Sequence, residues 1–356
     1  MFEIVAFSTQ FLIYGCLKEA GISRKARAIF AAWGIFWILA GAFAGKDFRY
    51  AELDIFPGRL AEILRALSLT WTIITILALG ALVLVWGFSG FRAFTRKRVY
   101  LAGVIALCMS VYCFCEAYFV MPRYAEIPTR KLPAGIDRLR IVCVSDAHIG
   151  GLSTHWHFSR MMRLAAEAEP DIFVLAGDTI DGVMSYRGRE LEMLAETAKK
   201  AKYGAFAVNG NHEYYWLLDE DCEQIIRDCG IRMLINERAE CAGITIISLD
   251  DNLNGWLKPY LLPEDSEKFV LVMKHRPGLP FDADGKFDLQ LSGHTHNGQY
   301  WPLGYLKSME QDSTQGLTQK SGGYVYVSSG AGFNGPPMRF LTFPEITVID
   351  IVRKGA

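Results

Sequence analysis

The sequence predicts an α/β (α+β) layered domain preceded by an N-terminal bundle of transmembrane helices. Apolar residues make up 51% of the 356-residue chain, and the excess lies in residues 1–121, so the two parts of the chain suit different solvents. From residue 139 onward, short apolar runs alternate with helical stretches, which is the pattern of a domain built from layers of strands and helices.

The region 1–121 predicts three to four membrane-spanning helices. Crossing the hydrocarbon core takes about 20 mostly apolar residues. Four runs are candidates, at about 4–17, 28–45, 66–88 and 99–121. The first run is short and contains the polar residues Ser8, Thr9 and Gln10, which leaves the number of spans at three or four. No basic residue precedes it, which argues against a cleaved signal peptide.

Basic residues in the loops predict the orientation of these helices. Lysine and arginine are enriched in short loops on the cytoplasmic side. The loops after the first and third runs each contain four of them: Lys18, Arg24, Lys25 and Arg27, and Arg92, Arg96, Lys97 and Arg98. The loop between these two also has four, over a longer stretch, so the bias is modest. With either three or four spans, the domain after Met121 is predicted to be extracytoplasmic, in a multi-pass protein of the cell membrane.

The boundary between the two parts is marked by proline. Residues 122–138 are predicted to form an extended linker, because Pro122 ends the last helix and proline fixes φ and removes a backbone donor. The C-terminal domain is expected over 139–356. Glu116, just before this boundary, is an acid within an apolar run, and such acids mark either a functional residue or exposure at the interface.

The elements expected in the C-terminal domain include more strands than helices. The predicted helices are 158–167, 189–201 and 220–228. The predicted strands are 139–145, 172–176, 205–208, 244–249, 269–273, 289–292, 324–328 and 346–351. Because the later part is richer in strands, a mixed sheet or a sandwich is favoured over a purely parallel sheet.

Five of the apolar runs are followed directly by residues that bind metals. In chain order these residues are Asp146 and His148, then Asp178, then Asn211, then His275, and finally His294 and His296. Sites in layered α/β folds form outside the carboxyl ends of strands, so these side chains are predicted to converge. The glycines Gly177, Gly210 and Gly293 permit tight turns and close backbone approach there.

The chemistry of this set predicts two metal ions. Imidazole, carboxylate and amide oxygen together suit Mn, Fe or Zn better than Ca or Mg. Seven ligands are too many for one ion, but they suit two ions that share one carboxylate. Such a pair serves the hydrolysis of phosphate esters. Five of the seven histidines lie in these elements, which a chance distribution does not explain.

At this point the motifs resemble the calcineurin-like metallophosphoesterase superfamily. The matching motifs are Asp146-x-His148, Gly177-Asp178-x-x-Asp181, Gly210-Asn211-His212-Glu213, His275 and Gly293-His294-x-His296. The resemblance covers about residues 139–352 and is closest to the membrane-anchored branch, in which several N-terminal helices precede the domain. Many relatives have Asp-Leu-His-Leu-Gly and Gly-His-Thr-His-Gly-Gly, where this chain has Asp-Ala-His-Ile-Gly and Gly-His-Thr-His-Asn-Gly. These departures spare every ligand and concern subfamily and substrate.

The resemblance implies a role for each motif residue. Asp146, His148 and His296 would hold the first metal. Asn211, His275 and His294 would hold the second, and Asp178 would bridge the two. His212 would protonate or stabilise the leaving oxygen, oriented by Asp181. The implied fold is a sandwich of two mixed β-sheets flanked by helices.

The function predicted is hydrolysis of a phosphomonoester or phosphodiester by in-line attack of a metal-bridging hydroxide, without a covalent enzyme intermediate. A lipid or cell-envelope intermediate and a water-soluble phosphodiester or nucleotide are both candidate substrates. A catalytically inactive phospho-ligand sensor or scaffold is the alternative. A transporter is not favoured, because the apolar runs lack paired charges and broken segments. The net charge of −1 indicates no general nucleic-acid binder.

Other residues leave alternatives open. The eight cysteines show no CxxC spacing and are predicted to be mostly free thiols, with one bridge among Cys222, Cys229 and Cys241 still open. His155 and His157 either line the cleft or start a helix that Ser or Thr caps. Aromatic residues beside the motifs either contact an acyl chain, lie at the bilayer interface or pack in the core: Tyr214, Tyr215, Trp216, Tyr300 and Trp301.

Overall fold

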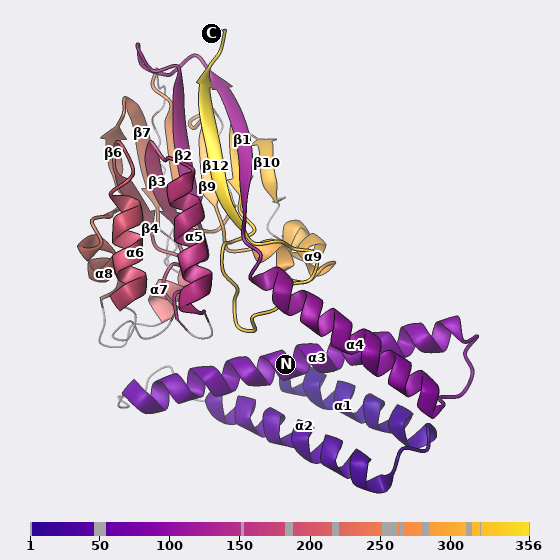
Figure 1. Ribbon diagram of the computed structural model, residues 1–356. Coiled ribbons are helices and arrows are strands. Elements are labelled where there is room, and N and C mark those ends of the chain that lie inside the picture. The colour runs from indigo at the N-terminus through magenta and orange to yellow at the C-terminus, as the bar shows by residue number, and fades with distance from the viewer. Residues whose placement is uncertain are drawn as a thin grey trace. The chain divides into compact units, whose positions relative to one another are not determined.

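The computed structural model describes residues 2–45, 55–150, 153–181, 188–215, 221–250, 263, 267–278, 285–310, 315–320 and 322–355. The chain divides into two compact units. The helical unit comprises Met1–Cys115 and Gly335–Met338, and the sheet unit comprises Glu116–Asn334 and Arg339–Ala356. Figure 1 shows the long helices of the first and the two β-sheets of the second.

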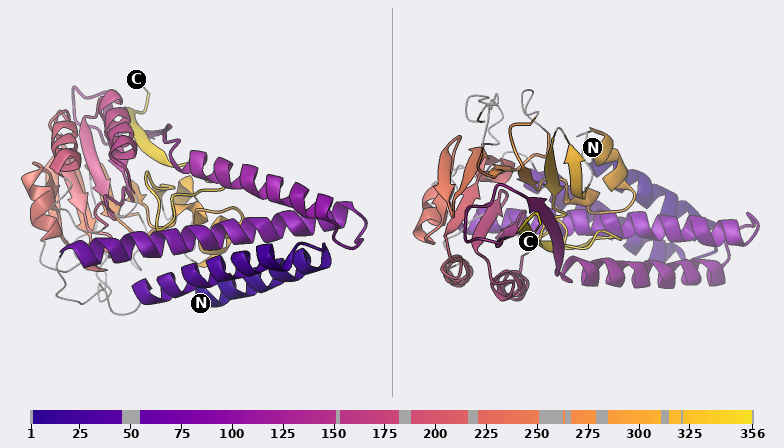
Figure 2. Two further views of the ribbon diagram at one scale, coloured as in Figure 1. Left: turned by 60° about the horizontal axis from the view of Figure 1, so that its bottom comes forward. Right: turned by 90° about the horizontal axis from the view of Figure 1, so that it is seen from above.

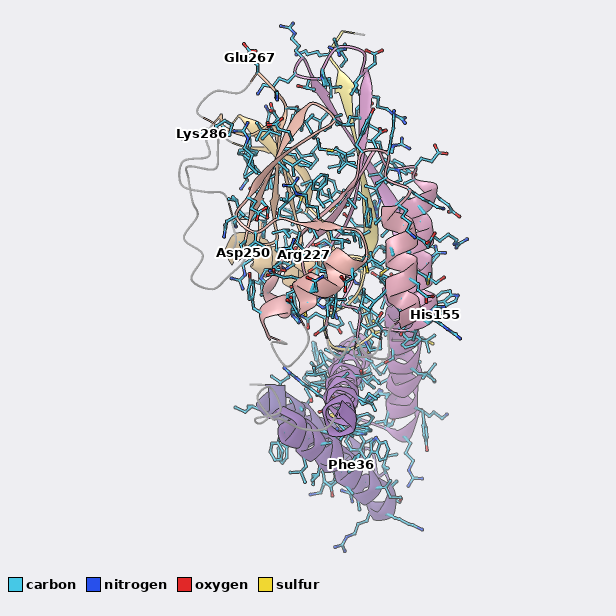
Figure 3. The ribbon with its side chains drawn as sticks, turned by 90° about the vertical axis from the view of Figure 1, so that its left-hand side faces the viewer. Phe36, His155, Arg227, Asp250, Glu267 and Lys286 are labelled. Carbon is cyan, nitrogen blue, oxygen red and sulfur yellow. The ribbon has the colours of Figure 1, made fainter. Side chains whose placement is uncertain are left out.

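The helical unit contains four long helices. They are α1 (Phe2–Glu19), α2 (Arg24–Gly45), α3 (Ile55–Phe88) and most of α4 (Arg96–Ala117). Among the residues that the structure describes, three segments are long and apolar enough to cross a membrane: Arg24–Ala42, Ile63–Phe88 and Arg96–Ala117. Many of their apolar side chains point outward, as does Phe36 of α2, which is 51% exposed (Figure 3). These three helices begin before the predicted runs, because charged residues at a helix end can reach the membrane surface without ending the helix.

The sheet unit contains two mixed sheets of six strands each, which confirms the predicted fold class. The first sheet has the order β1 (Met121–Thr129), β12 (Glu345–Arg353), β2 (Arg138–Val144), β3 (Ile172–Ala176), β4 (Ala205–Val208) and β5 (Arg232–Met233). The second has the order β10 (Gly316–Lys320), β11 (Gly323–Val327), β9 (Leu289–Ser292), β8 (Val270–Lys274), β7 (Ile244–Leu249) and β6 (Arg238–Cys241). Within each sheet four neighbouring strands are parallel, β2–β3–β4–β5 in the first and β7–β8–β9–β11 in the second.

The first sheet is buried on both faces, because it separates two apolar cores. Ile141 and Cys143 of β2 point into the core between the sheets, whereas Val142 and Val144 point into the core under the helices. This alternation follows from the period of two along a strand. The covering helices are α5 (His155–Glu167), α6 (Gly188–Ala198) and α8 (Cys222–Asp228), and Figure 2 shows α5 and α6 side by side against this face.

The segment predicted as a linker begins with a strand, which corrects that prediction. Met121–Thr129 forms β1 and pairs in parallel with β12 along its whole length. β1 is the edge strand of its sheet, and an edge tolerates Pro122 and Pro128 because one side of the strand needs no donors. The same pairing ends α4 at Ala117, four residues before the predicted end of the last membrane run.

The direction of β1 decides at which end of the first sheet the chain enters it from α4. β1 runs parallel to β12, and β12 runs antiparallel to β2. Along the strand direction, the first residue of β1 therefore lies at the same end of the sheet as the last residue of β2. Only residues 118–120 separate α4 from β1.

Candidate metal centre

The predicted ligands converge at one end of the two sheets. The segments after β2, β3, β4, β8 and β9 bring together three groups of side chains whose ligand atoms lie within 4.8 Å of one another in each group. The groups are Asp146, His148 and His296; His148, Asp178 and His212; and Asp178, His275 and His294. His148 and Asp178 each belong to two groups, so the three form one continuous cluster. The sheet topology explains the convergence, because each of these residues follows the carboxyl end of a parallel strand.

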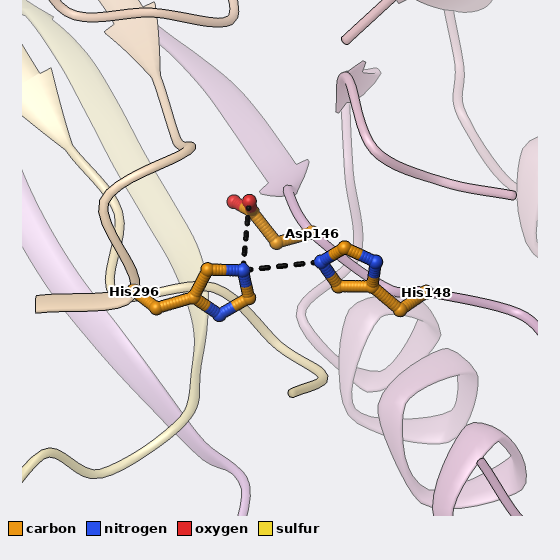
Figure 4. Close-up of side chains that lie close together, drawn as sticks. All are labelled: Asp146, His148 and His296. Carbon is orange, nitrogen blue, oxygen red and sulfur yellow. Dashed lines mark hydrogen bonds and ion pairs between the residues drawn. The ribbon is translucent and has the colours of Figure 1, made fainter. Parts of the chain in front are cut away.

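The first group is fully buried. His296 Nε2 lies 3.3 Å from Asp146 Oδ1 and 3.1 Å from His148 Nε2 (Figure 4). His296 lies four residues after the end of β9, in the 3₁₀ turn η2 (His296–Gly298), which places it opposite the loop after β2. Two imidazole nitrogens and a carboxylate oxygen that point at one another are a favourable arrangement when a cation lies between them.

In the third group, which comprises Asp178, His275 and His294, the hydrogen bonds decide which nitrogen of His275 faces the site. Its Nδ1 donates to the carbonyl oxygen of Ala176 at 2.8 Å, so the lone pair of a neutral ring is on Nε2. Nε2 lies 3.1 Å from Asp178 Oδ2, and His275 is completely buried. Burial opposes ionisation of Asp178, but the neighbouring histidines, His275 foremost, outweigh it and hold the pKa of that carboxyl well below its usual value.

Asn211 begins the short helix α7 (Asn211–Tyr215), which follows β4. Its side-chain Oδ1 is buried and meets no hydrogen-bond donor among the residues that the structure describes. A buried amide oxygen without a donor is costly, and a cation would satisfy it. The donor set of this cluster therefore fits divalent cations. Gly210 is needed just before Asn211, because a Cβ at that position would overlap the Asp178 side chain.

The backbone at the cluster is unusual. Five of the seven predicted ligands have left-handed φ values between 47° and 68°, a conformation that side chains other than glycine rarely adopt: Asp146, His148, Asp178, His294 and His296. Hydrogen bonds hold these turns in place. His148 N–H donates to the carbonyl of Asp178 at 3.0 Å, and His294 N–H donates to Asp146 Oδ1 at 3.0 Å. Clustered conformations of this kind are typical of functional sites.

Glu213 ties two of the ligand loops together. Its buried carboxylate accepts the backbone N–H groups of Asp178, Thr179, Ile180 and Gly210 at 2.7–3.0 Å. The loops after β3 and β4 are thereby held side by side, which fixes Asp178 next to Asn211. In the sequence, Glu213 is part of the motif Gly210-Asn211-His212-Glu213, but no role could be predicted for it. Its position directly after His212 was the only signal.

His212 lies at the edge of the cluster and is held by Asp181. Its Nδ1 lies 3.1 Å from Asp181 Oδ1, and the other oxygen of Asp181 lies 3.2 Å from His148 Nδ1. The His212 side chain remains 13% exposed, whereas that of Asp178 is 1% exposed. Burial lowers the pKa of His212, but the charge and hydrogen bond of Asp181 outweigh it and raise the pKa to about 9. The His212 ring thus lies within reach of solvent at the edge of the cluster.

Arg339 is a residue of this region that the sequence analysis missed. It is completely buried, and burial lowers its pKa to about 10. Its guanidinium donates to the carbonyl oxygens of Ser329, Gly332 and Thr342 at 2.6–2.9 Å, and Nη2 lies 3.2 Å from His296 Nδ1. The loop after β11 is thus folded around this side chain, next to His296. Arg339 lies outside every metal motif, so no local pattern indicated it.

The other histidines and the cysteines lie outside the cluster. His155 is exposed and points away from the sheets at the start of α5 (Figure 3), where Thr154 caps the helix by accepting the N–H of His157. His157 is buried and stacks on Phe333 with ring centres 5.4 Å apart, and burial lowers its pKa to about 3. No disulfide joins any two of the eight cysteines, all of which lie among the described residues. Trp216 lies outside the described residues.

The comparisons with known proteins agree with this geometry. Residues 139–298 match the model of a family described as calcineurin-like phosphoesterase. An uncharacterized metallophosphoesterase from Aquifex aeolicus is 34% identical over 70% of this chain and 99% of that protein. One from Helicobacter pylori is 26% identical over 99% of this chain and 98% of that protein. A Danio rerio protein named transmembrane protein with metallophosphoesterase domain is 30% identical over 73% of this chain, which spans 63% of that protein's length.

Proposed function

Because the chain belongs to the calcineurin-like metallophosphoesterase family, we propose that it is a membrane-bound hydrolase of phosphoric esters that works with two divalent cations. Asp146, His148 and His296 would hold one cation, and Asn211, His275 and His294 the other. Asp178 would bridge them. The observation that carries the proposal is the shared position of Asp178, which belongs to two of the three ligand groups. When bound, the cations lower the pKa of a water and neutralise charge on the phosphoryl oxygens.

The residues of the chain that do not bind metal complete the reaction. His212 is placed to protonate the leaving oxygen, because its ring is held by Asp181 and keeps an exposed edge. Asp181 also contacts His148, so one carboxylate orients both a ligand and the acid. The high pKa of His212 would fall toward neutrality beside bound cations, because like charges repel.

The ligand types favour certain metals, and the apolar helices favour a certain class of substrate. Imidazole and carboxylate ligands favour Mn, Fe or Zn. Both phosphomonoesters and phosphodiesters are candidate substrates, and a lipid or cell-envelope phosphoester is favoured by the apolar helices that precede the sheets. An inactive phospho-ligand sensor is the alternative, but every ligand that the family resemblance implies is present in this chain.

Metal removal tests the proposed activity. We expect the full-length protein in detergent, stripped by a chelator and reloaded with Mn²⁺, to bind two ions per chain and to hydrolyse a bis-aryl phosphodiester. Metal content is measured by mass spectrometry of the acid-digested protein, and hydrolysis by release of the aryl alcohol. If the protein bound two ions but hydrolysed no aryl monoester or diester with Mn²⁺, Fe²⁺ or Zn²⁺, the proposed enzymatic activity would be contradicted. The inactive phospho-ligand sensor would then be the remaining candidate function.

We propose further that α1 is a fourth membrane span. Its polarity is the reverse of that of a helix on a soluble protein, because its apolar side chains Ile4, Phe7 and Phe11 are 60–71% exposed. Two of its polar residues face inward instead: Thr9 Oγ1 lies 3.2 Å from Thr75 Oγ1 of α3, and Gln10 packs against Gly34 of α2. Polar contacts between helices and apolar outer surfaces are typical of helices in lipid.

Four spans would place the N-terminus and the sheet unit on the same side of the membrane. The basic loops at 18–27 and 92–98 favour the outer side. We expect epitope tags at both ends of the chain to bind antibody on intact cells or spheroplasts. An accessible C-terminal tag with a protected N-terminal tag would indicate three spans, and two protected tags would reverse the orientation.

A further inference from the structure

Helix α9 (Leu303–Glu310) presents apolar side chains outward. We define the α9 patch as Trp301, Leu303, Tyr305, Leu306 and Met309, each of which is 47–81% exposed. Gly304 lies on the other side of the helix, where it packs so closely on η2 that a Cβ would lie 2.6 Å from the carbonyl oxygen of Asn297. A surface helix in water turns its apolar side toward the protein, and α9 does the opposite.

The α9 patch is connected by hydrogen bonds to the end of α4. Trp301 N–H donates to the carbonyl of Phe340 at 2.8 Å, and the next residue, Leu341, is itself 50% exposed. The backbone N–H groups of Leu341 and Thr342 donate to the two carboxylate oxygens of Glu116 at 2.9 and 2.5 Å. Glu116 belongs to the last turn of α4, whose residues Arg96–Ala117 are long and apolar enough to cross a membrane.

The sequence left two alternatives for Glu116, a functional residue or exposure at the interface, and its burial argues against the second. It is only 3% exposed, and both of its oxygens are used by the segment that pairs with Trp301. The acid therefore fixes the end of a candidate membrane span to the segment next to α9. All of these residues belong to the sheet unit, so the connection is part of that unit's own fold.

The candidate metal centre lies at the same end of the sheets as Glu116 and the segment that it binds. Met121, the first residue of β1, pairs with Glu345, and the N–H of Glu345 donates to the carbonyl of Gly330 at 3.0 Å. The next two residues, Ala331 and Gly332, donate their N–H groups to the carbonyls of Ser145 and Asp146 at 2.8 Å. On the other side, α9 follows the turn that contains His296. The ligands thus lie at the same end of the sheets as the end of α4 and the α9 patch.

We propose that the α9 patch lies in the interfacial layer of the lipid bilayer and holds the metal centre at the level of the headgroups. Tryptophan and tyrosine are enriched at this depth, and short helices with an outward apolar side bind there. Because a candidate membrane span ends only a few hydrogen bonds away from the α9 patch, the bilayer surface is expected at this end of the sheets. A second copy of the chain is the other possible occupant of such a patch, and the experiment separates the two.

Photo-cross-linking of the full-length protein in nanodiscs of phosphatidylethanolamine and phosphatidylglycerol tests the proposal. A benzophenone amino acid replaces Tyr305 or Met309, and in the negative control it replaces Asp137. The Asp137 side chain is 79% exposed and lies beside the first residue of β2, at the opposite end of the sheet. Phe36 on α2 is the positive control for lipid contact. We expect phospholipid adducts from 36, 305 and 309 and none from 137. Adducts to a second copy, none from 305 and 309, or equal adducts from 137 would overturn the proposal.

A charged variant separates this surface from the catalytic proposal. In the double variant L306D/M309D we expect lipid adducts from position 305 to fall roughly tenfold, because about 1.4 kcal/mol or more of interfacial affinity is lost. Hydrolysis of a soluble aryl phosphodiester and metal content should remain at the level of the parent. Unchanged lipid adducts would contradict the bilayer contact whether or not the protein is an active phosphoesterase.

Discussion

Asp178→Asn is expected to lower kcat/KM for an aryl phosphodiester roughly a thousandfold and to reduce the metal content below two ions per chain. The carboxylate is shared between two ligand groups, and its Oδ2 lies 3.1 Å from His275 Nε2. An amide keeps the shape and can still accept the His212 N–H that Oδ1 now accepts at 2.8 Å, so the fold should persist. Losing the shared charge removes about 4 kcal/mol of stabilisation, which corresponds to about three orders of magnitude in rate.

The matched control is Asp137→Asn, the same chemical change on an exposed carboxylate that pairs with Arg353 outside the cluster. It should leave both activity and metal content unchanged. Activity is measured by release of the aryl alcohol, and metal content by mass spectrometry on the same preparations. If Asp178→Asn kept two ions and lost less than about tenfold in kcat/KM, Asp178 would not bridge the cations.

His212→Asn is expected to lower kcat by about 10²–10⁴-fold while the protein still binds two ions, because the ring donates a proton without binding metal. The loss should depend on the leaving group. An alkyl leaving oxygen needs the proton, whereas a nitrophenolate departs without it, so the defect should be smaller for nitrophenyl esters. The measurement is kcat for a series of phosphodiesters whose leaving groups differ in pKa, with metal content determined in parallel.

His155→Asn is the control for this substitution, because His155 is exposed at the start of α5 and outside the cluster. It should behave like the parent protein. A loss of bound metal in His212→Asn would identify His212 as a ligand, in line with its place in one of the three groups. A defect that is equal for all leaving groups would show that His212 does not protonate the leaving oxygen.

The strands that could be predicted well are those buried on both faces. β3, β4, β7 and β9 agree residue for residue with the predicted runs, because a strand between two cores is a continuous apolar segment with no exposed side. β1 and β6 could not be predicted. Arg238–Cys241 alternates exposed and buried residues over only four positions, and β1 contains two prolines and two charged residues. Their pairing depends on a partner strand, which no local pattern reveals.

The sequence by itself determined the identity of the candidate ligands, because glycine turns after apolar runs and the repeated histidines are local features. It also determined the class of fold and the apolar helices. Only the tertiary structure decided how these residues are held. The carboxylates of Glu213 and Glu116 accept hydrogen bonds from backbone N–H groups of other segments, and the Arg339 guanidinium donates to backbone carbonyl oxygens. Such bonds depend on the partner's backbone and not on its side chain, so they leave no trace in the residues that they hold.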